Sequence, residues 1–357
     1  MATLQELGWN SFFEQKFAPF QAKGFEVGRV AIENRGSYLV YTPQGDFQAE
    51  IAGKLQFKAA SAVNLPKVGD WVVMSTFPQN GKAIIHELLP RQSKFSRRAP
   101  GRNASEQVMA TNINVIFVMQ SLDGDFSPRR LERYLAMIYE GGITPVILLS
   151  KTDLCEDVPA KIVAATFVAP GVEVWALSPQ LDEGVDKVRQ YLKHGLTFAL
   201  IGSSGVGKST LVNRLLGQEV QKTAEVRASD SKGRHTTTHR ELILLPDGGL
   251  LIDTPGMREL QLWEGHEGIT ETFNDVEDLV KQCRFSDCGH TNEPGCAVLA
   301  ALAKGELLQS RYQSYLRLQR ERAILEQSEA DRRRKAKDFK RLTKQINQRQ
   351  KSKYDHD

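Results

Sequence analysis

The sequence has 357 residues, more than one typical domain, and therefore predicts two or three domains. Its 41% hydrophobic and 25% charged residues are ordinary for a soluble globular protein, and its longest apolar runs fall well short of the roughly 20 residues that span a bilayer. The formal net charge of +4 is unevenly spread, because residues 310–357 contain fifteen Lys or Arg and seven Asp or Glu.

The two ends of the chain differ in character. The first residues, MATLQELGWNSFFEQKF, contain no basic segment followed by an apolar core, so they do not form a secretory signal and we expect a cytoplasmic protein. The basic C-terminal block is typical either of a solvated, partly disordered extension or of an arm that neutralises phosphates.

Short alternating apolar segments separated by turn residues fill residues 24–90. This pattern predicts a small all-β barrel of about five strands. The next segment, 91–107, is basic, contains Gly and Pro, and is interpreted as a linker or surface loop. A first domain is therefore expected over residues 1–107.

From residue 108 the pattern changes to apolar strands that alternate with helices. This rhythm predicts an α/β domain with a mainly parallel sheet covered on both faces, expected over residues 108–272. After residue 275 the chain becomes helical around a Cys/His cluster, and from residue 307 it has the pattern of a long charged helix. We expect a C-terminal helical domain over residues 273–357.

A phosphate-binding loop lies between the predicted strand 197–201 and the predicted helix 210–217. The segment GSSGVGKST matches G-x-x-x-x-G-K-S/T in full and in the context that the motif requires. Backbone N–H groups would surround the phosphates, Lys208 would reach the β and γ oxygens, and Ser209 would ligate Mg²⁺. The predicted nucleotide-binding residues of this loop are Gly202, Ser203, Ser204, Gly205, Val206, Gly207, Lys208, Ser209 and Thr210.

The purine base is expected at the end of the predicted strand 144–150. Ser150, Lys151, Thr152 and Asp153 match the N/T-K-x-D guanine motif with Ser in first position. Asp153 would accept bonds from guanine N1 and N2, which adenine cannot supply, although the four-residue match taken alone favours a solvated helix N-cap at Asp153.

A second base-contacting segment follows the predicted strand 172–175. It resembles the loop that contacts the guanine oxygen through backbone N–H groups, and its residues are Ala176, Leu177 and Ser178.

Two segments after the phosphate loop are expected at the Mg²⁺ ion and the γ-phosphate. Asp253 and Gly256 belong to a DTPG sequence that follows an apolar strand, and Thr236 and Thr237 lie in the switch candidate GRHTTTHREL, residues 233–242. The chain order is base motif, base loop, phosphate loop, threonine switch and DTPG. Because such sites assemble in space, this order predicts a circularly permuted GTPase.

Three cysteines and a histidine fall within fourteen residues: Cys283, Cys288, His290 and Cys296. They supply a complete Cys₃His set for one structural Zn²⁺, with no open position for catalysis. Zinc would hold a short segment that lacks its own core. Cys155 stands apart and is interpreted as a packing residue.

Together these motifs closely resemble the circularly permuted GTPases of the ribosome small-subunit-dependent GTPase A family, the YjeQ/RsgA type. The resemblance covers nearly the whole chain and implies an N-terminal OB-fold, a permuted GTPase domain and a C-terminal zinc-binding helical domain. It also implies a GTP hydrolase that binds the rRNA of the small ribosomal subunit late in assembly and is stimulated by that subunit.

The resemblance further implies that His235 orients the attacking water once RNA orders the switch. Ras-type enzymes use a glutamine after the DxxG glycine, where this chain has Met257. Lys208 and Mg²⁺ would stabilise charge on the phosphoryl oxygens.

Two other functions remain open on the sequence. One is a non-ribosomal regulatory GTPase whose basic tail contacts RNA or a membrane, and the other is an RNA-binding module with a decayed GTPase site. Intact Lys208, Ser209 and Asp253 argue against decay, and the tail lacks the sustained apolar face of a membrane-surface helix. We expect GTP and GDP as ligands, no membrane partner and a monomer.

Overall fold

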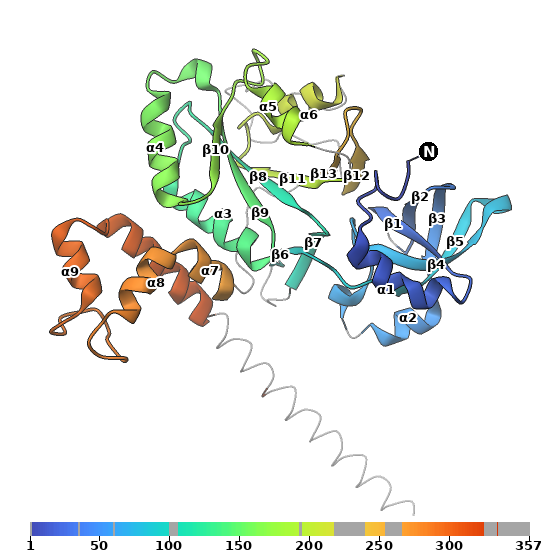
Figure 1. Ribbon diagram of the computed structural model, residues 1–357, viewed down its shortest axis with the longest axis horizontal. Helices are drawn as coiled ribbons and strands as arrows, with labels where there is room; N and C mark the ends of the chain where they lie inside the picture. Colours follow the sequence, from blue (N-terminus) through green and yellow to red (C-terminus); the bar gives the residue numbers. More distant parts are fainter. Residues whose placement is uncertain are drawn as a thin grey trace, which may run out of the picture.

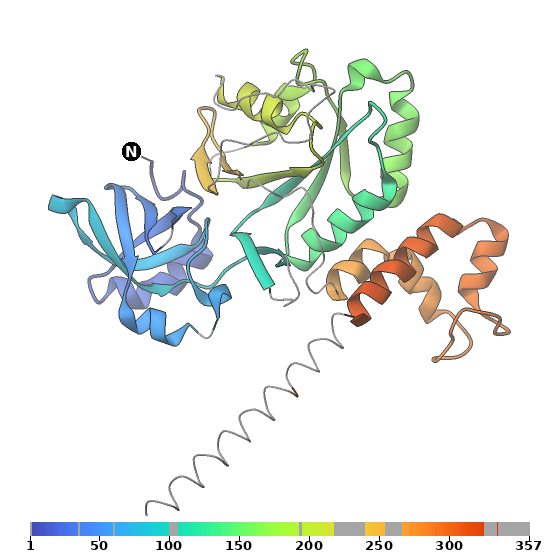
Figure 2. The same cartoon turned by 180° about the vertical axis from the view of Figure 1, so that it is seen from behind.

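The computed structural model describes residues 2–34, 36–59, 61–99, 106–192, 195–217, 240–253, 266–324 and 334. Figures 1 and 2, seen from opposite sides, show a β-barrel and a helical C-terminal part, with an α/β part between them. Among the described residues, no helix is both long and apolar enough to cross a lipid bilayer.

The N-terminal part is a closed five-stranded barrel that follows a short helix. Helix α1 (Ser11–Gln21) begins at Asn10, whose side chain accepts bonds from the N–H groups of Phe12 and Phe13. The barrel closes because β4 pairs with both β5 and β1 in the order β1-β2-β3-β5-β4, which confirms the five strands expected over residues 24–90. Its elements are β1 (Glu26–Glu33), β2 (Tyr38–Thr42), β3 (Gly45–Ile51), α2 (Gly53–Lys58), η1 (Ala62–Asn64), β4 (Trp71–Phe77), η2 (Pro78–Asn80) and β5 (Lys82–Leu88).

The segment interpreted as a linker contains regular structure. Strand β6 (Lys94–Arg98) pairs antiparallel with β7 (Glu106–Thr111) in a separate two-stranded sheet. Phe95 is fully buried, and Lys94 forms an ion pair of 2.6 Å with Glu106 across the two strands. The interpretation of residues 91–107 as a linker or surface loop is therefore wrong for the strands, because the partner strand lies beyond the Gly/Pro segment that suggested a loop.

The central part is the expected mainly parallel sheet with helices on both faces. In the order β10-β9-β8-β11-β13-β12 the first five strands are parallel, and β12 runs antiparallel to β13. One core joins the sheet to α3 and α4, and another joins it to α5 and α6 (Figure 1). The elements are β8 (Val115–Ser121), α3 (Pro128–Glu140), β9 (Thr144–Ser150), η3 (Thr152–Leu154), α4 (Val158–Val168), β10 (Glu173–Ala176), α5 (Val185–Tyr191), β11 (Thr197–Gly202), α6 (Lys208–Leu216), β12 (Glu241–Leu244) and β13 (Leu250–Asp253).

The C-terminal part is helical and packs on α3. It contains α7 (His266–Thr272), α8 (Asn274–Lys281), α9 (Ala297–Lys304) and a helical segment over 309–324. Gly268 of α7 lies so close to α3 that a β-carbon there would be 1.8 Å from the Ala136 carbonyl oxygen. The two helices can therefore approach only with glycine at this position.

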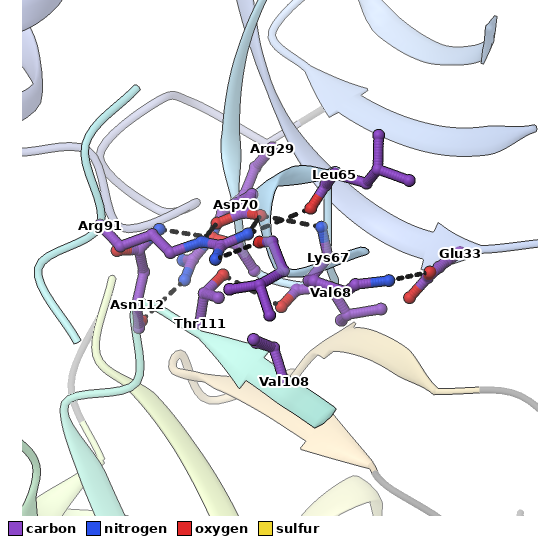
Figure 3. A network of polar contacts seen from close by, with 12 residues as sticks. Arg29, Glu33, Leu65, Lys67, Val68, Asp70, Arg91, Val108, Thr111 and Asn112 are labelled. Atoms are coloured by element: carbon purple, nitrogen blue, oxygen red, sulfur yellow. Dashed lines mark hydrogen bonds and ion pairs between the residues drawn. The ribbon is translucent and has the colours of Figure 1, made fainter. Parts of the chain in front are cut away.

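The barrel and the α/β part share one sheet and a buried polar junction. Strand β1 pairs with β12 through Ile32 and Glu241, which extends the sheet to eleven strands. Arg29 of β1 is buried at the junction, where burial lowers its pKa to about 9 (Figure 3). Its guanidinium donates to the Leu7 carbonyl (2.5 Å), the Thr197 hydroxyl (2.9 Å), the Asn112 carbonyl (3.0 Å) and the Gly69 carbonyl (3.2 Å).

A second contact at this junction fixes the loop that leads into β4. Asp70, which is fully buried, accepts two bonds of 2.8 and 2.7 Å from Arg91 (Figure 3). Gly69 has a φ of +94°, and a β-carbon there would lie 2.1 Å from the Thr111 carbonyl oxygen. The barrel and the α/β part are thus held together by the close backbone approach at Gly69 and by the hydrogen bonds of Arg29.

Candidate functional site

The predicted nucleotide-binding segments meet at the carboxyl edge of the parallel strands. Strand β8 ends at Ser121, β9 at Ser150, β10 at Ala176, β11 at Gly202 and β13 at Asp253. The chain proceeds from β8 toward β10 on one side and from β11 toward β13 on the other, so the strand order reverses between β8 and β11. Ligands of open α/β sheets bind in the crevice at such a reversal, and the phosphate loop follows β11.

The phosphate loop has the backbone geometry that its glycines allow. A β-carbon at Gly202 would lie 2.3 Å from the Met119 carbonyl oxygen of the neighbouring strand, so no other residue fits there. Gly207 has a φ of +95° and a β-carbon there would meet Met119 Cε at 4.0 Å, an ordinary contact. The need for glycine at Gly207 therefore comes from its positive φ rather than from contact with protein atoms.

Lys208 opens helix α6, and its ammonium is folded over the loop. Nζ donates to the carbonyl oxygens of Gly202 at 2.8 Å and Ser203 at 2.6 Å. The N-cap residue of α6 is Gly207, which has no side chain to cap the helix, and the start of a helix favours an anion. The loop and the ammonium are therefore candidates for binding a phosphate.

Ser150 ties the base motif to the phosphate loop. Its hydroxyl donates to the Val206 carbonyl at 2.6 Å and also lies 3.3 Å from the Gln120 carbonyl. The serine that replaces the usual asparagine therefore still joins the two halves of the site.

Asp153 joins the two base-contacting segments. Its carboxylate accepts a bond of 2.6 Å from the Ser178 hydroxyl, which follows β10. The alternative that Asp153 is a helix N-cap is wrong, because helix α4 is capped by Asp157, whose side chain accepts from the Ala160 N–H. One oxygen of Asp153 is thus fixed by Ser178.

Two acidic residues at this edge were missed by the motif search. Asp123 and Asp125 lie in the loop between β8 and α3 and hold Lys151 and Arg130 through ion pairs of 2.5 and 2.9 Å. Burial raises the pKa of Asp123, but bonds from Lys151 and from the Ser121 hydroxyl outweigh it and leave the pKa below its usual value. The available signal was a pair of carboxylates directly after an apolar strand, at the strand-order reversal.

The structure describes two of the residues that were predicted to bind Mg²⁺. Ser209 lies in the first turn of α6, which follows β11, and Asp253 ends β13, the strand that pairs in parallel with β11. A hydroxyl and a carboxylate oxygen are ligands that Mg²⁺ prefers, so this edge of the sheet fits the ion. The other predicted residues of the switch and γ-phosphate segments lie outside the described residues: His235, Thr236, Thr237 and Gly256.

The Cys/His cluster has the dimensions of a tetrahedral zinc site. The ligand atoms of Cys283, Cys288, His290 and Cys296 all lie within 4.8 Å of one another. Bonds of about 2.3 Å from zinc to sulfur imply edges of about 3.8 Å. Cys283 Sγ lies 3.9 Å from Cys296 Sγ and 3.6 Å from His290 Nδ1, and His290 Nδ1 lies 3.3 Å from Cys296 Sγ. Three soft sulfurs and one imidazole at these distances fit Zn²⁺.

The loop that carries these ligands is folded by its own backbone. Glu293 accepts bonds from the N–H groups of Gly289 (2.9 Å), Thr291 (2.8 Å) and Asn292 (3.0 Å), and these bonds lower the pKa of Glu293 to about 2. His290 adopts a left-handed φ of 54°. The turn thus presents His290 to the cysteines without an apolar core of its own.

Comparisons with known proteins agree with this geometry. The family model described as RsgA GTPase matches residues 88–263. "Small ribosomal subunit biogenesis GTPase RsgA 2" of Lactiplantibacillus plantarum is 48% identical over 83% of this chain and 83% of the relative. "Small ribosomal subunit biogenesis GTPase RsgA" of Opitutus terrae is 45% identical over 90% of each chain.

Solved structures give the same fold. YjeQ from Thermotoga maritima superposes with a TM-score of 0.63 at 24% identity, over 84% of this chain and 99% of that chain. YloQ, described as a circularly permuted GTPase, superposes with a TM-score of 0.60 at 25% identity, over 84% of this chain and 96% of that chain. The sequence-based prediction of a permuted GTPase is confirmed. Since identities above 40% extend across more than four fifths of the chain, this protein belongs to the RsgA GTPase family and hydrolyses GTP.

Proposed function

We propose that this GTPase acts in the biogenesis of the small ribosomal subunit, where it binds rRNA in the cytoplasm as a monomer and is stimulated by the subunit. The observation that carries the proposal is the extent of the similarity. Relatives named small ribosomal subunit biogenesis GTPases match 83–90% of this chain, which includes much of the sequence on both sides of the GTPase part.

The barrel supports the RNA part of the proposal. We assign it to the OB-fold, a five-stranded architecture that binds oligonucleotides. Phe57 of α2 is 93% exposed and lies between the exposed residues Lys54 and Lys58. An aromatic ring on which a base can stack, flanked by ammonium groups, is the chemistry of single-stranded nucleic-acid binding.

We propose three functional units with the limits expected from the sequence, 1–107, 108–272 and 273–357. Zinc in the last unit would be structural, because the four donors fill a tetrahedral shell. The buried ion pair between Arg311 and Glu132 joins this unit to α3.

The reaction is in-line attack of water on the γ-phosphate. Lys208 binds the phosphoryl oxygens from the start of α6, and Asp153 selects guanine. Mg²⁺ would supply further charge neutralisation, held by Ser209, Asp253 and Thr237. His235 orients the water from the segment that leads into β12.

The test is steady-state GTP hydrolysis with and without small ribosomal subunits, with large subunits and ATP as controls. The proposal expects a large increase that is specific to small subunits and GTP. No increase with either subunit despite tight GTP binding would favour a regulatory GTPase outside the ribosome.

The role of His235 has its own test. His235→Ala is expected to keep GTP binding and to lose roughly a hundredfold in stimulated turnover, the lower range for a positioned acid or base. His239→Ala, in the same segment, is the control and should leave turnover unchanged. Unchanged stimulated turnover in His235→Ala would sink the assignment.

A further inference from the structure

Helix α3 presents different residues to the phosphate loop and to the C-terminal part. Arg130 and Tyr134, four residues apart on one face, reach the phosphate loop. Residues 132, 133, 136 and 140 lie on another face and contact the C-terminal part. One rigid helix of thirteen residues therefore touches both regions.

Arg130 is held in a defined orientation beside the phosphate loop. Its guanidinium donates to both carboxylate oxygens of Asp125 at 2.9 and 3.0 Å and to the Asp125 carbonyl at 2.7 Å. Nη1 of Arg130 also donates a hydrogen bond to the hydroxyl of Ser203. A bidentate pair fixes a guanidinium plane, so the contact with Ser203 is directional.

The phenol of Tyr134, on the same face of α3, also interacts electrostatically with the Ser203 hydroxyl. Burial raises the pKa of Tyr134, while the charge of Arg130 and the bond with Ser203 act in the opposite direction. Ser203 belongs to the loop whose carbonyl oxygens hold the Lys208 ammonium. Helix α3 is therefore linked through the Ser203 hydroxyl to the loop that carries the predicted phosphate-binding groups.

The other face of α3 is attached firmly to the C-terminal part. Glu132 forms a 2.9 Å ion pair with Arg311, and both side chains are 2% exposed. Arg133 donates to Glu321 at 2.7 Å, and the Gly268 N–H donates to Glu140 at 3.0 Å.

We propose that Arg130 is a positioning residue for GTP hydrolysis: through Ser203 it fixes the phosphate loop to α3, so that movement of the C-terminal part reaches the loop through this helix. The inference rests on GTP hydrolysis at this loop and needs no ribosomal partner. Because the contact with Ser203 depends on the guanidinium fork held by Asp125, a lysine, which carries a single ammonium, should recover only part of the effect.

The first experiment measures intrinsic kcat and KM for GTP in the absence of ribosomal subunits. Arg130→Ala is expected to lower kcat/KM roughly tenfold, the effect of one hydrogen bond to a charged group, and Arg130→Lys to give a kcat/KM between those of Arg130→Ala and wild type. Arg129→Ala is the matched control, since Arg129 is an exposed arginine on the same turn of α3. Equal activities of Arg130→Ala and Arg129→Ala overturn the proposal.

A double-mutant cycle identifies the partner. Ser203→Ala should weaken hydrolysis, and Arg130→Ala should add little in the Ser203→Ala background, because both changes remove the same contact. If the activity losses of the two single variants multiply in the double variant, Arg130 acts elsewhere and the proposal is overturned. Thermal unfolding of each variant should remain near wild type, because the Arg130 and Asp125 side chains are partly exposed.

The link to the C-terminal part has a matched pair of variants. Arg133 and Arg317 both pair with Glu321, at 2.7 and 3.8 Å, but only Arg133 belongs to α3. Arg133→Gln should lower intrinsic turnover about twofold, an effect on the scale of one partly exposed ion pair, and should have no effect in the Arg130→Ala background. Arg317→Gln should leave turnover unchanged. If Arg133→Gln lowers turnover equally in the wild type and in Arg130→Ala, the proposed link between the C-terminal part and the phosphate loop is overturned.

These outcomes are separate from those of the proposed function. All variants are compared without ribosomal subunits, so a failure of small subunits to stimulate the wild type would count against the ribosomal role and leave the Arg130 result intact.

Discussion

Replacing Arg311 by Met is expected to lower the free energy of unfolding by about 4 kcal/mol, the cost of leaving a buried charge without its partner. Arg311 lies between α3 and the C-terminal helices. It donates to Glu132 at 2.9 Å, to both oxygens of Asp275 at 2.7 Å, and to the carbonyls of Thr272 (2.9 Å) and Val168 (3.2 Å).

The size of the expected loss in unfolding free energy depends on Glu132 rather than on Asp275. Asp275 is 41% exposed and water can solvate it once Arg311 is gone, whereas Glu132 is 2% exposed. A Met side chain keeps much of the apolar contact, so the loss comes from the orphaned carboxylate and from two carbonyls that lose a donor. A second change, Glu132→Gln, removes that charge and should restore at least half of the stability.

The assay is urea unfolding followed by circular dichroism at pH 8 and pH 5. In the wild type, burial raises the pKa of Glu132, and Ser314 and Arg311 oppose this effect without cancelling it. The pKa of Glu132 is therefore higher in the folded than in the unfolded protein, and folding favours the protonated carboxyl group at pH values between these two pKa values. Loss of Arg311 raises that pKa further. Protonation then relieves the buried charge, and the deficit of Arg311→Met should be smaller at pH 5 than at pH 8.

The control is Arg317→Met on the same helical segment. Arg317 is 72% exposed and its pair with Glu321 is 3.8 Å long, so the expected loss is below about 1 kcal/mol. The reasoning is refuted if Arg311→Met and Arg317→Met lose equal stability, or if the deficit of Arg311→Met grows as the pH falls.

Three further outcomes are expected. Gly69→Ala should destabilise the protein by at least about 2 kcal/mol more than Gly24→Ala in thermal unfolding, because both glycines have positive φ but a β-carbon clashes only at Gly69, against a backbone carbonyl. Ser150→Ala should weaken binding of fluorescent GDP and GTP about fivefold, since two buried carbonyls lose its hydroxyl; equal affinities would contradict the tie between the base motif and the phosphate loop. Cys288→Ser should reduce the zinc content measured by mass spectrometry and unfold the C-terminal helices, whereas Cys155→Ser should keep one zinc per chain.

The elements that the sequence predicted well are those set by local pattern. The strand 115–121 is buried at every position, so its unbroken apolar run is diagnostic of a strand covered on both faces. The phosphate loop was recognisable because its glycine positions and its helix start are determined within nine residues. In such segments the local sequence alone is sufficient to predict the structure.

The parts that escaped prediction depend on distant partners. Strand β6 is a strand because β7 pairs with it beyond an intervening segment, and its own residues KFSRR carry little strand signal. The orientation of Asp153 depends on Ser178, 25 residues away. The burial of Arg29 depends on acceptors from four other stretches of the chain, which no local sequence pattern indicates.

The position of Arg29 also has a consequence for synthesis on the ribosome. Its acceptors emerge in the order Leu7, Gly69, Asn112 and Thr197, and the last is 168 residues further along the chain. A guanidinium buried before Thr197 is made lacks one of its partners, so the barrel cannot reach its final low-energy state as soon as its own strands are complete. Burial of this guanidinium is thereby delayed until the phosphate-loop strand β11 has begun to form, so the junction between the barrel and the α/β part is completed late in synthesis.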